Sequence, residues 1–233
     1  MATNWSDDPE ELERQLEDAR EELGWALGDQ LVATSTDADL ADKVGALRLR
    51  VRRLEDRLAW VLRTREPGFE PTDYGLLAKQ VAALAEDGTP WVSGLANASS
   101  AMSEALPATN WVGFYLTSLR ADGTPELVVG PFQGRPGCTP IAYGRGVCGT
   151  AAQADRTQLV PDVHDFPGHI ACDSASASEL VVPLHAGGQV IGVIDLDSPV
   201  AGRFAQADAD GMALVARALE PVLAGVLPLR QGQ

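Results

Sequence analysis

GPFQGRPGCTPIAYGRGVCGTAAQADRTQLVPDVHDFPGHIACDSASASELVVPLHAGGQVIGVIDLD, the stretch from Gly130 to Asp197, is where the reactive side chains of this 233-residue chain gather. It holds all three cysteines, all three histidines and a run of carboxylates that ends at Asp197. Its C-terminal part contains two β-like apolar runs, 180–184 and 190–196, joined by the turn sequence HAGGQ. The stretch therefore predicts a β-hairpin, and it is where chemistry is expected.

The three cysteines, Cys138, Cys148 and Cys172, are expected to be reduced thiols. No secretory signal is evident, and an odd number leaves one thiol over in any pairing. Nine residues separate the first two and twenty-three the last two, which is too wide for the paired CxxC knuckles of a structural zinc site. Small neighbouring residues favour accessible thiols in loops. Inert buried thiols and a Cys3His zinc site that uses His164 or His169 remain as alternatives.

Outward from this stretch, the residues predict a domain built on an antiparallel sheet. Two further β-like runs, 111–119 and 126–129, are joined by RADGTP, whose Asp-Gly pair favours a hairpin. Apolar residues at helical spacing predict helices over 74–86, 92–106 and 207–227, and another helix is expected to begin near Val147. Hairpins flanked by terminal helices indicate an α+β fold with helices packed on one face of the sheet.

The N-terminal residues have the pattern of two paired helices. One is predicted over 8–31, where Asp8 can cap the first turn and Pro9 suits the first helical position. The other, over 40–62, carries apolar residues in an unbroken heptad rhythm. Residues 1–31 contain ten acidic and two basic groups, whereas residues 40–66 contain eight basic and four acidic groups. Opposite charge favours an antiparallel hairpin or coiled coil, alone or across a homodimer.

Two short segments divide the chain. The polar run TSTDAD at 34–39 is expected to separate the two N-terminal helices. Pro67, Gly68 and Pro71 interrupt helical structure and predict a linker over 67–71. The expected organisation is therefore a helical hairpin over 1–66 and a second domain over 72–233.

The overall composition is that of an ordinary soluble globular protein, with 45% hydrophobic and 22% charged residues. No apolar run approaches the length of a membrane span, and the acidic N-terminus is unlike the basic start of a signal peptide, so the chain is expected in the cytoplasm. The net charge of −15 argues against nucleic acid and anionic membrane as partners, because both are polyanions that require a basic surface.

Five blocks of sequence occur in a recognisable order. They are NWVGFYL at 110–116, LVVGPFQGRPGC at 127–138, GRGVCGTAA at 144–152, TQLVPDVHDFPGHIACDSASASELVVPL at 157–184 and VIGVIDLDSP at 190–199. Together they resemble the free methionine-(R)-sulfoxide reductases, a family of enzymes with the GAF fold. The resemblance covers residues 72–227 and includes the three cysteines of the family. It implies a GAF-type antiparallel sheet, and the long N-terminal segment departs from the family's single-domain pattern.

The resemblance implies thioredoxin-dependent reduction of free L-methionine-(R)-sulfoxide to L-methionine. Cys172 matches the nucleophile, whose thiolate would attack the sulfoxide sulfur and become a sulfenic acid. Cys138 is expected to resolve this intermediate as a disulfide. Cys148 is a second candidate for that disulfide, or an intermediate acceptor, because spacing cannot rank the two. Thioredoxin is the implied reductant, and the chemistry requires neither a metal nor an organic cofactor.

Glu179, Asp195 and Asp197 match the acidic positions of the family. Glu179 is expected to protonate the sulfoxide oxygen, since clustering in a partly enclosed pocket raises the pKa of a carboxyl group. Asp195 and Asp197 are expected to bind the substrate's α-ammonium, and Trp111 and Tyr143 to form an apolar wall against its methyl thioether. By strand period alone, the two aspartates are simply the outward face of a half-buried strand, and Trp111 is simply core.

A second function from another class competes with the reductase. A GAF domain can be a sensor that binds a small ligand and signals through N-terminal helices, and the fold alone permits this. The three cysteines and the three carboxylates favour the enzyme, because a sensor needs no resolving thiol. For the enzyme, the glycine-rich loops over 133–146 and 164–178 are expected to move during turnover, since each bears a cysteine that must reach another.

Overall fold

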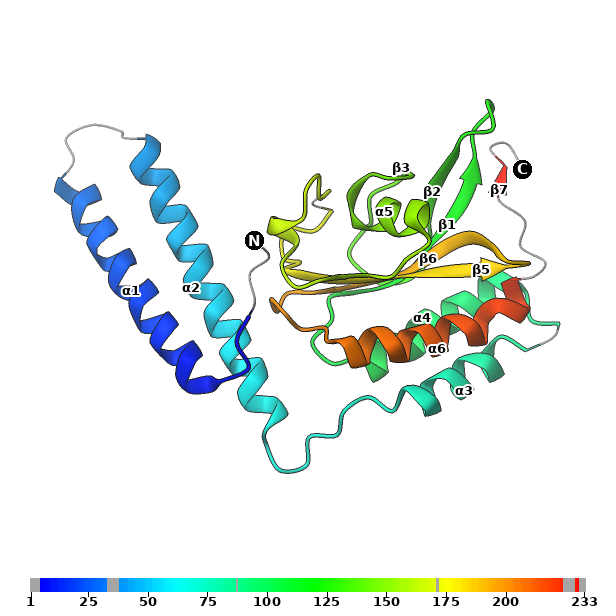
Figure 1. Ribbon diagram of the computed structural model, residues 1–233, viewed down its shortest axis with the longest axis horizontal. Coiled ribbons are helices and arrows are strands. Elements are labelled where there is room, and N and C mark those ends of the chain that lie inside the picture. Colours follow the sequence, from blue (N-terminus) through cyan, green and yellow to red (C-terminus); the bar gives the residue numbers. More distant parts are fainter. Residues whose placement is uncertain (1–4, 33–37, 87, 171, 224–228, 231–233) are drawn as a thin grey trace. The chain divides into compact units, whose positions relative to one another are not determined.

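The computed structural model describes residues 5–32, 38–86, 88–170, 172–223 and 229–230. The chain divides into two compact units, one spanning Asn4–Glu70 and the other running from Pro71 onward (Figure 1). Each unit is described by itself below. Within the described ranges, none of the helices combines the length and the apolar character that crossing a bilayer requires.

The N-terminal unit is a hairpin of two helices, α1 (Pro9–Val32) and α2 (Ala38–Thr64), which confirms the two predicted helices. Asp8 Oδ1 accepts a hydrogen bond from the backbone N–H of Glu10 at 3.2 Å and so caps the first turn of α1. The seam between the helices is apolar and contains Leu12, Leu16, Ala19, Ala26, Val44, Leu47, Leu54 and Val61. Residues 33–37 of the expected break lie outside the described residues.

Ion pairs link the two helices across the seam. Arg20 NH2 lies 2.6 Å from Glu55 Oε1, Arg50 NH1 lies 3.1 Å from Glu22 Oε2, and Arg57 pairs with Asp7. The first two pairs are exposed, so each stabilises the hairpin by about 0.2–1 kcal/mol at most.

The second unit is built on a sheet with the strand order β3-β2-β1-β6-β5-β4, in which all neighbours are antiparallel. The strands are β1 (Trp111–Leu119), β2 (Pro125–Gly134), β3 (Ile141–Ala142), β4 (Gln158–Val160), β5 (Ser178–Ala186) and β6 (Gln189–Ser198). A short strand, β7 (Leu229–Arg230), pairs in parallel with the end of β1. The two predicted hairpins are therefore confirmed, as β1–β2 and β5–β6.

The sheet separates two layers of different composition (Figure 1). Helices α4 (Trp91–Ala105) and α6 (Gln206–Leu223) cover one face and α3 (Tyr74–Leu84) packs against them, whereas α5 (Gly146–Ala154) and its connecting loops cover the other face. Phe114, Leu180 and Ile194 belong to the core on the first face. Tyr115, Val181 and Val193 belong to the core on the α5 face, because successive strand side chains point to opposite faces.

The helices on one face and the antiparallel sheet agree with the sequence analysis, but two details differ. β2 is longer than the predicted run 126–129, because it continues along β1 to Gly134 past an irregularity between Gly113 and Tyr115. The described part of α6 ends at Leu223, and residues 224–227 of the predicted final helix lie outside the described residues. Placement of α5 on the opposite face adds a layer that the pattern did not indicate.

Candidate active site

A pocket opens on the α5 face of the sheet. Its lining comes from β1, β5, β6, the start of α5 and two loops, and comprises Trp111, Tyr115, Pro136, Gly137, Ile141, Arg145, Gly146, Val147, Cys148, His169, Ile170, Cys172, Asp173, Ser176, Glu179, Asp195 and Asp197. The volume open to the centre of a water molecule is about 40 Å³. Every carboxylate predicted for the site therefore lies in one cavity, together with two of the three cysteines.

Strand register brings the three carboxylates together. Glu179 of β5 lies directly opposite Asp197 of β6, and Asp197 lies opposite Trp111 of β1. Asp195, two residues before Asp197, points to the same face. Glu179 and Asp195 are both only 5% exposed, so the simpler interpretation, in which the aspartates form a solvated outer face, does not describe Asp195.

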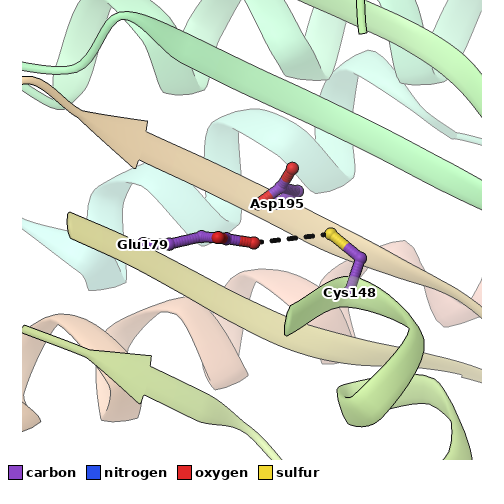
Figure 2. A group of neighbouring side chains, drawn as sticks. All are labelled: Cys148, Glu179 and Asp195. Carbon is purple, nitrogen blue, oxygen red and sulfur yellow. Dashed lines mark hydrogen bonds between the residues drawn. The ribbon is translucent and has the colours of Figure 1, made fainter. Parts of the chain in front are cut away.

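Helix α5 places Cys148 beside these carboxylates. The helix begins at Gly146, whose φ of +61° favours glycine. Gly149 allows a close approach to β3, since a Cβ there would lie 2.3 Å from the carbonyl oxygen of Ala142. The Cys148 thiol donates a hydrogen bond of 3.6 Å to Glu179 Oε1, and Asp195 lies beside this pair on β6 (Figure 2).

The carboxyl groups of the pocket favour their neutral forms. Burial raises the pKa of Glu179 well above its usual range, and the neighbouring Asp195 and Asp197 charges raise it further. Burial likewise raises the pKa of Asp197 well above normal, and that of Asp195 to about 7. The pKa of the Cys148 thiol is also raised, first by burial and then by Asp195. Burial and mutual repulsion therefore shift all three carboxyl groups towards their neutral forms.

The other two cysteines form a disulfide. Cys138, in the loop between β2 and β3, is bonded to Cys172, in the loop before β5, with 5.4 Å between their Cα atoms. Cys148 is a free, buried thiol. In this oxidised form the sulfurs of Cys138 and Cys172 are bonded to each other and are not free thiolates for a Cys3His zinc site. Cys148, Glu179 and Asp195 do offer donor atoms within 4.8 Å of one another, a set able to hold a cation.

The aromatic residues differ in their relation to the pocket. Trp111 lines it and stacks between Tyr115, at 5.4 Å between ring centroids, and Phe132, at 5.1 Å. Tyr143 is not among the lining residues, and its hydroxyl group lies 2.8 Å from Thr117 Oγ1. Tyr115 lines the pocket although the sequence analysis did not select it. The period of the strand could have found it, since it is four residues from Trp111 on the same face.

The sequence analysis did not select four polar lining residues as site residues: Arg145, His169, Asp173 and Ser176. His169 Nε2 lies 3.9 Å from Glu179 Oε2, and burial lowers the pKa of this histidine, which favours the neutral imidazole. The last three are in the irregular segment before β5. Such a segment has no periodicity from which a direction could be read.

Comparison with known proteins places these features among GAF domains. The GAF domain family model matches residues 95–223. A free methionine-R-sulfoxide reductase of Escherichia coli is 48% identical over 151 residues, which are 65% of this chain and 88% of that protein. About a third of this chain therefore has no counterpart in the bacterial reductase.

Two solved structures represent the two functions under consideration. The free methionine-R-sulfoxide reductase of Staphylococcus aureus in complex with substrate is 45% identical, with a TM-score of 0.60, and the match covers 68% of this chain and 100% of that one. A protein of Burkholderia vietnamiensis described as a proposed GAF sensor is 53% identical, with a TM-score of 0.58, and the match covers 63% and 90% of the two chains.

Proposed function

Because this chain belongs to the GAF domain family and is close to the free methionine-R-sulfoxide reductases, we propose that it reduces free L-methionine-(R)-sulfoxide to L-methionine with thioredoxin as the reductant. The observation that carries the proposal is the Cys138–Cys172 disulfide, which lies beside a pocket of buried carboxyl groups with raised pKa values. A thiol pair and a proton donor are the two components that reduction of a sulfoxide requires.

The proposed reaction begins on the reduced enzyme. The sulfur of Cys172 attacks the sulfoxide sulfur while the sulfoxide oxygen is protonated. The oxygen then passes from the substrate sulfur to the sulfur of Cys172, the substrate's sulfur–oxygen bond and the transient sulfur–sulfur bond break, and methionine leaves with Cys172 as a sulfenic acid. The thiol of Cys138 displaces that oxygen as water and closes the disulfide. Thioredoxin, an external dithiol, reduces the disulfide by exchange and is itself oxidised. Such a cycle belongs in a reducing compartment, and we propose the cytoplasm.

Glu179 is the proposed proton donor. It lines the pocket with Cys172, and its raised pKa keeps it protonated near neutral pH, which is the state that a general acid requires. Cys148 is hydrogen-bonded to it at 3.6 Å and is buried with a raised pKa. A buried neutral thiol is a poor nucleophile, so Cys148 is kept only as the second candidate for the resolving role.

The pocket also accounts for a preference for the free amino acid. An α-ammonium that enters the pocket supplies the positive charge that permits Asp195 or Asp197 to ionise. Peptide-bound methionine sulfoxide lacks this ammonium and would leave a buried carboxyl group unmatched. Trp111 is proposed as the apolar wall for the methyl thioether. Tyr143 keeps that role only as a prediction, because it lies outside the pocket and Tyr115 lies inside it.

The test couples turnover to NADPH oxidation through thioredoxin reductase and thioredoxin. The substrates are free L-methionine-(R)-sulfoxide, its (S) epimer and an N-acetylated, amidated analogue. We expect turnover of the free (R) form alone, complete loss in Cys172→Ser and retention of disulfide formation in Cys148→Ser. Absence of turnover by the folded, reduced chain would refute the proposal, and loss of methionine formation in Cys148→Ser but not in Cys172→Ser would reverse the assignment of the nucleophile.

A small-molecule sensor is the second candidate function, and one observation favours it: the similarity, at 53% identity, to the protein described as a proposed GAF sensor. In that case the pocket holds a ligand without turnover, and the helical hairpin transmits the signal. Calorimetry with methionine sulfoxide and methionine on the Cys172→Ser variant separates the two functions. Binding by the variant together with turnover by the wild type supports the enzyme, and binding without turnover by either supports the sensor.

We further propose that the chain is a homodimer in which the helical hairpin takes part. The hairpin leaves acidic side chains of α1 and basic side chains of α2 exposed, and Trp25 is 71% exposed on α1. These surfaces have the opposite charges that a two-fold pairing of hairpins requires.

A further inference from the structure

The two loops that carry the disulfide are also joined by one carboxylate, that of Asp173. Asp173 follows Cys172 in sequence, and its Oδ1 accepts hydrogen bonds from Arg135 NH1 at 3.4 Å and from the backbone N–H of Ala175 at 2.9 Å. Arg135 lies three residues before Cys138 on the opposite loop. A charged contact therefore bridges the segments that the disulfide itself bridges.

The start of β1 anchors both sides of this bridge. Asn110 Nδ2 donates to Asp173 Oδ2 at 3.2 Å and to Ser176 Oγ at 3.1 Å, which holds the Cys172 loop. Trp111 Nε1 donates to the backbone carbonyl of Arg135 at 3.0 Å, which holds the Cys138 loop. Two adjacent residues, Asn110 just before β1 and Trp111 at its start, thus hold one loop each. The Arg135–Asp173 ion pair then connects the two loops directly.

We propose that Arg135, through its ion pair with Asp173, is a positioning residue that brings Cys138 to Cys172 for disulfide closure. The inference rests on the proposed function, in which this closure resolves the sulfenic acid. Arg135 is 74% exposed and is not among the residues that line the pocket, so it acts on the loops and not on the substrate.

Two physical effects support this role. The ion pair raises the fraction of time that the loops are close enough for the two sulfurs to react, since a disulfide requires Cα atoms within about 7 Å. The guanidinium also offsets the negative charge of Asp173, which otherwise repels the incoming Cys138 thiolate. In the resolving step that thiolate forms the sulfur–sulfur bond, the sulfur–oxygen bond of the sulfenic acid breaks, and hydroxide leaves and is protonated to water.

The size of the effect follows from the exposure of the pair. An exposed ion pair changes an equilibrium by up to about five-fold, so Arg135→Ala is expected to slow closure by about three- to five-fold. The sulfenic acid on Cys172 then persists for correspondingly longer and becomes available to further oxidation. Because exposed pairs are screened by salt, added salt is expected to slow closure in the wild type more than in the variant.

The experiment follows both steps of a single turnover by the reduced full-length chain in the absence of thioredoxin. Rapid quenching measures methionine release, and dimedone labelling with mass spectrometry measures the lifetime of the sulfenic acid on Cys172. For Arg135→Ala we expect an unchanged rate of methionine release, a sulfenic acid that lives about three to five times longer, and near-complete recovery in Arg135→Lys. Arg156→Ala, which removes an exposed arginine outside both cysteine loops, is the matched control and is expected to behave as the wild type.

A second oxidant tests the role of Arg135 in disulfide closure independently of the proposed reduction of methionine sulfoxide. Hydrogen peroxide also converts the Cys172 thiolate to a sulfenic acid, with water as the other product, so closure can be timed without methionine sulfoxide. Failure of the wild type to release methionine would refute the proposed function, whereas the peroxide reaction still reports on closure. An unchanged sulfenic acid lifetime in Arg135→Ala with either oxidant would overturn the positioning role, as would a slower release of methionine, which would mean that Arg135 acts on the chemistry.

Discussion

Glu179 shows how far the surroundings of one residue change its chemistry. In the sequence it is an ordinary glutamate at the start of a strand. In the structure it is 5% exposed, lies opposite Asp197 on the neighbouring strand β6 and accepts a hydrogen bond from Cys148. Burial beside other carboxylates stabilises its neutral form, which is the form that the proposed proton donor requires.

Replacement of Glu179 tests that role. Glu179→Gln keeps the size of the side chain and removes the transferable proton, so the rate of methionine release in a single turnover is expected to fall by about 10²-fold or more, the usual contribution of a general acid. Glu104→Gln, at an exposed position of α4, is the control. A fall of less than about three-fold in Glu179→Gln would assign the proton donation to another group.

Asp195 predicts how stability depends on pH. Its pKa is raised from 3.8 to about 7 by burial, so the folded state binds a proton more tightly than the unfolded state. The stabilising effect is complete below the unfolded pKa and is lost as the pH rises through the folded pKa. The free energy of unfolding is therefore expected to fall between about pH 4 and pH 7, by at most about 1.4 kcal/mol per pH unit for this group.

Denaturant unfolding at a series of pH values checks this prediction. Asp195→Asn removes the ionisable group with little change in size, and its free energy of unfolding is expected to fall less steeply over the same pH range than that of the wild type. The comparison uses the reduced chain for both proteins, so that the disulfide does not contribute. If the two proteins show the same pH dependence, Asp195 does not titrate as its burial predicts.

At the scale of elements, the disulfide links two loops that close the pocket. Residues of both loops line the pocket, among them Gly137 and His169. We therefore predict that the loops over 133–146 and 164–178 separate after reduction and widen the access to the site.

Hydrogen–deuterium exchange measured by mass spectrometry checks this movement. On reduction, amides in both loops are expected to exchange faster, by about ten-fold or more, because a crosslink that restricts local opening is removed. Amides of the central strands β1 and β6, which stay paired in both forms, provide the internal control. Equal exchange of the loops in the oxidised and reduced forms would show that the pocket opens in some other way.

At the scale of the whole molecule, the hairpin of α1 and α2 is an extra unit joined to a GAF domain. Glu13 and Glu17 are exposed one turn apart on α1, as are Arg48 and Arg52 on α2. Helical spacing places both pairs on the side of the hairpin that carries the Arg20–Glu55 ion pair. In the proposed homodimer, we expect the acidic pair of one chain to meet the basic pair of its partner.

Charge reversal tests whether the hairpin mediates self-association. In the full chain, Arg48→Glu with Arg52→Glu is expected to weaken dimerisation by about ten-fold or more, measured by analytical ultracentrifugation, because like charges then face each other. Adding Glu13→Arg and Glu17→Arg restores the attraction and is expected to restore the dimer. A dimer that is unaffected by the first pair of substitutions would locate the interface elsewhere.

Much of the fold was accessible from the sequence because it is encoded by local pattern. Heptad spacing located α1 and α2, and Asp-Gly and Gly-Gly turns located the two hairpins of the sheet. The position of α5 was only partly accessible. A glycine loop marked its start near Val147, but no local pattern indicated which face of the sheet it covers or that Gly149 lies close to Ala142 of β3.

The sequence by itself determined which residues are proposed for the chemistry: the three cysteines, Glu179, Asp195 and Asp197 are identified by residue type within motifs that resemble a family. Only the tertiary structure decided how they are combined. In the structure, Cys138 is bonded to Cys172 across 34 residues of sequence, and the free thiol of Cys148 is hydrogen-bonded to Glu179. Tyr115 lines the pocket, whereas the predicted Tyr143 does not. The physical reason is that motifs and periodicity are local, whereas burial, pKa values and the distance between two loops depend on strand register and on packing between distant segments.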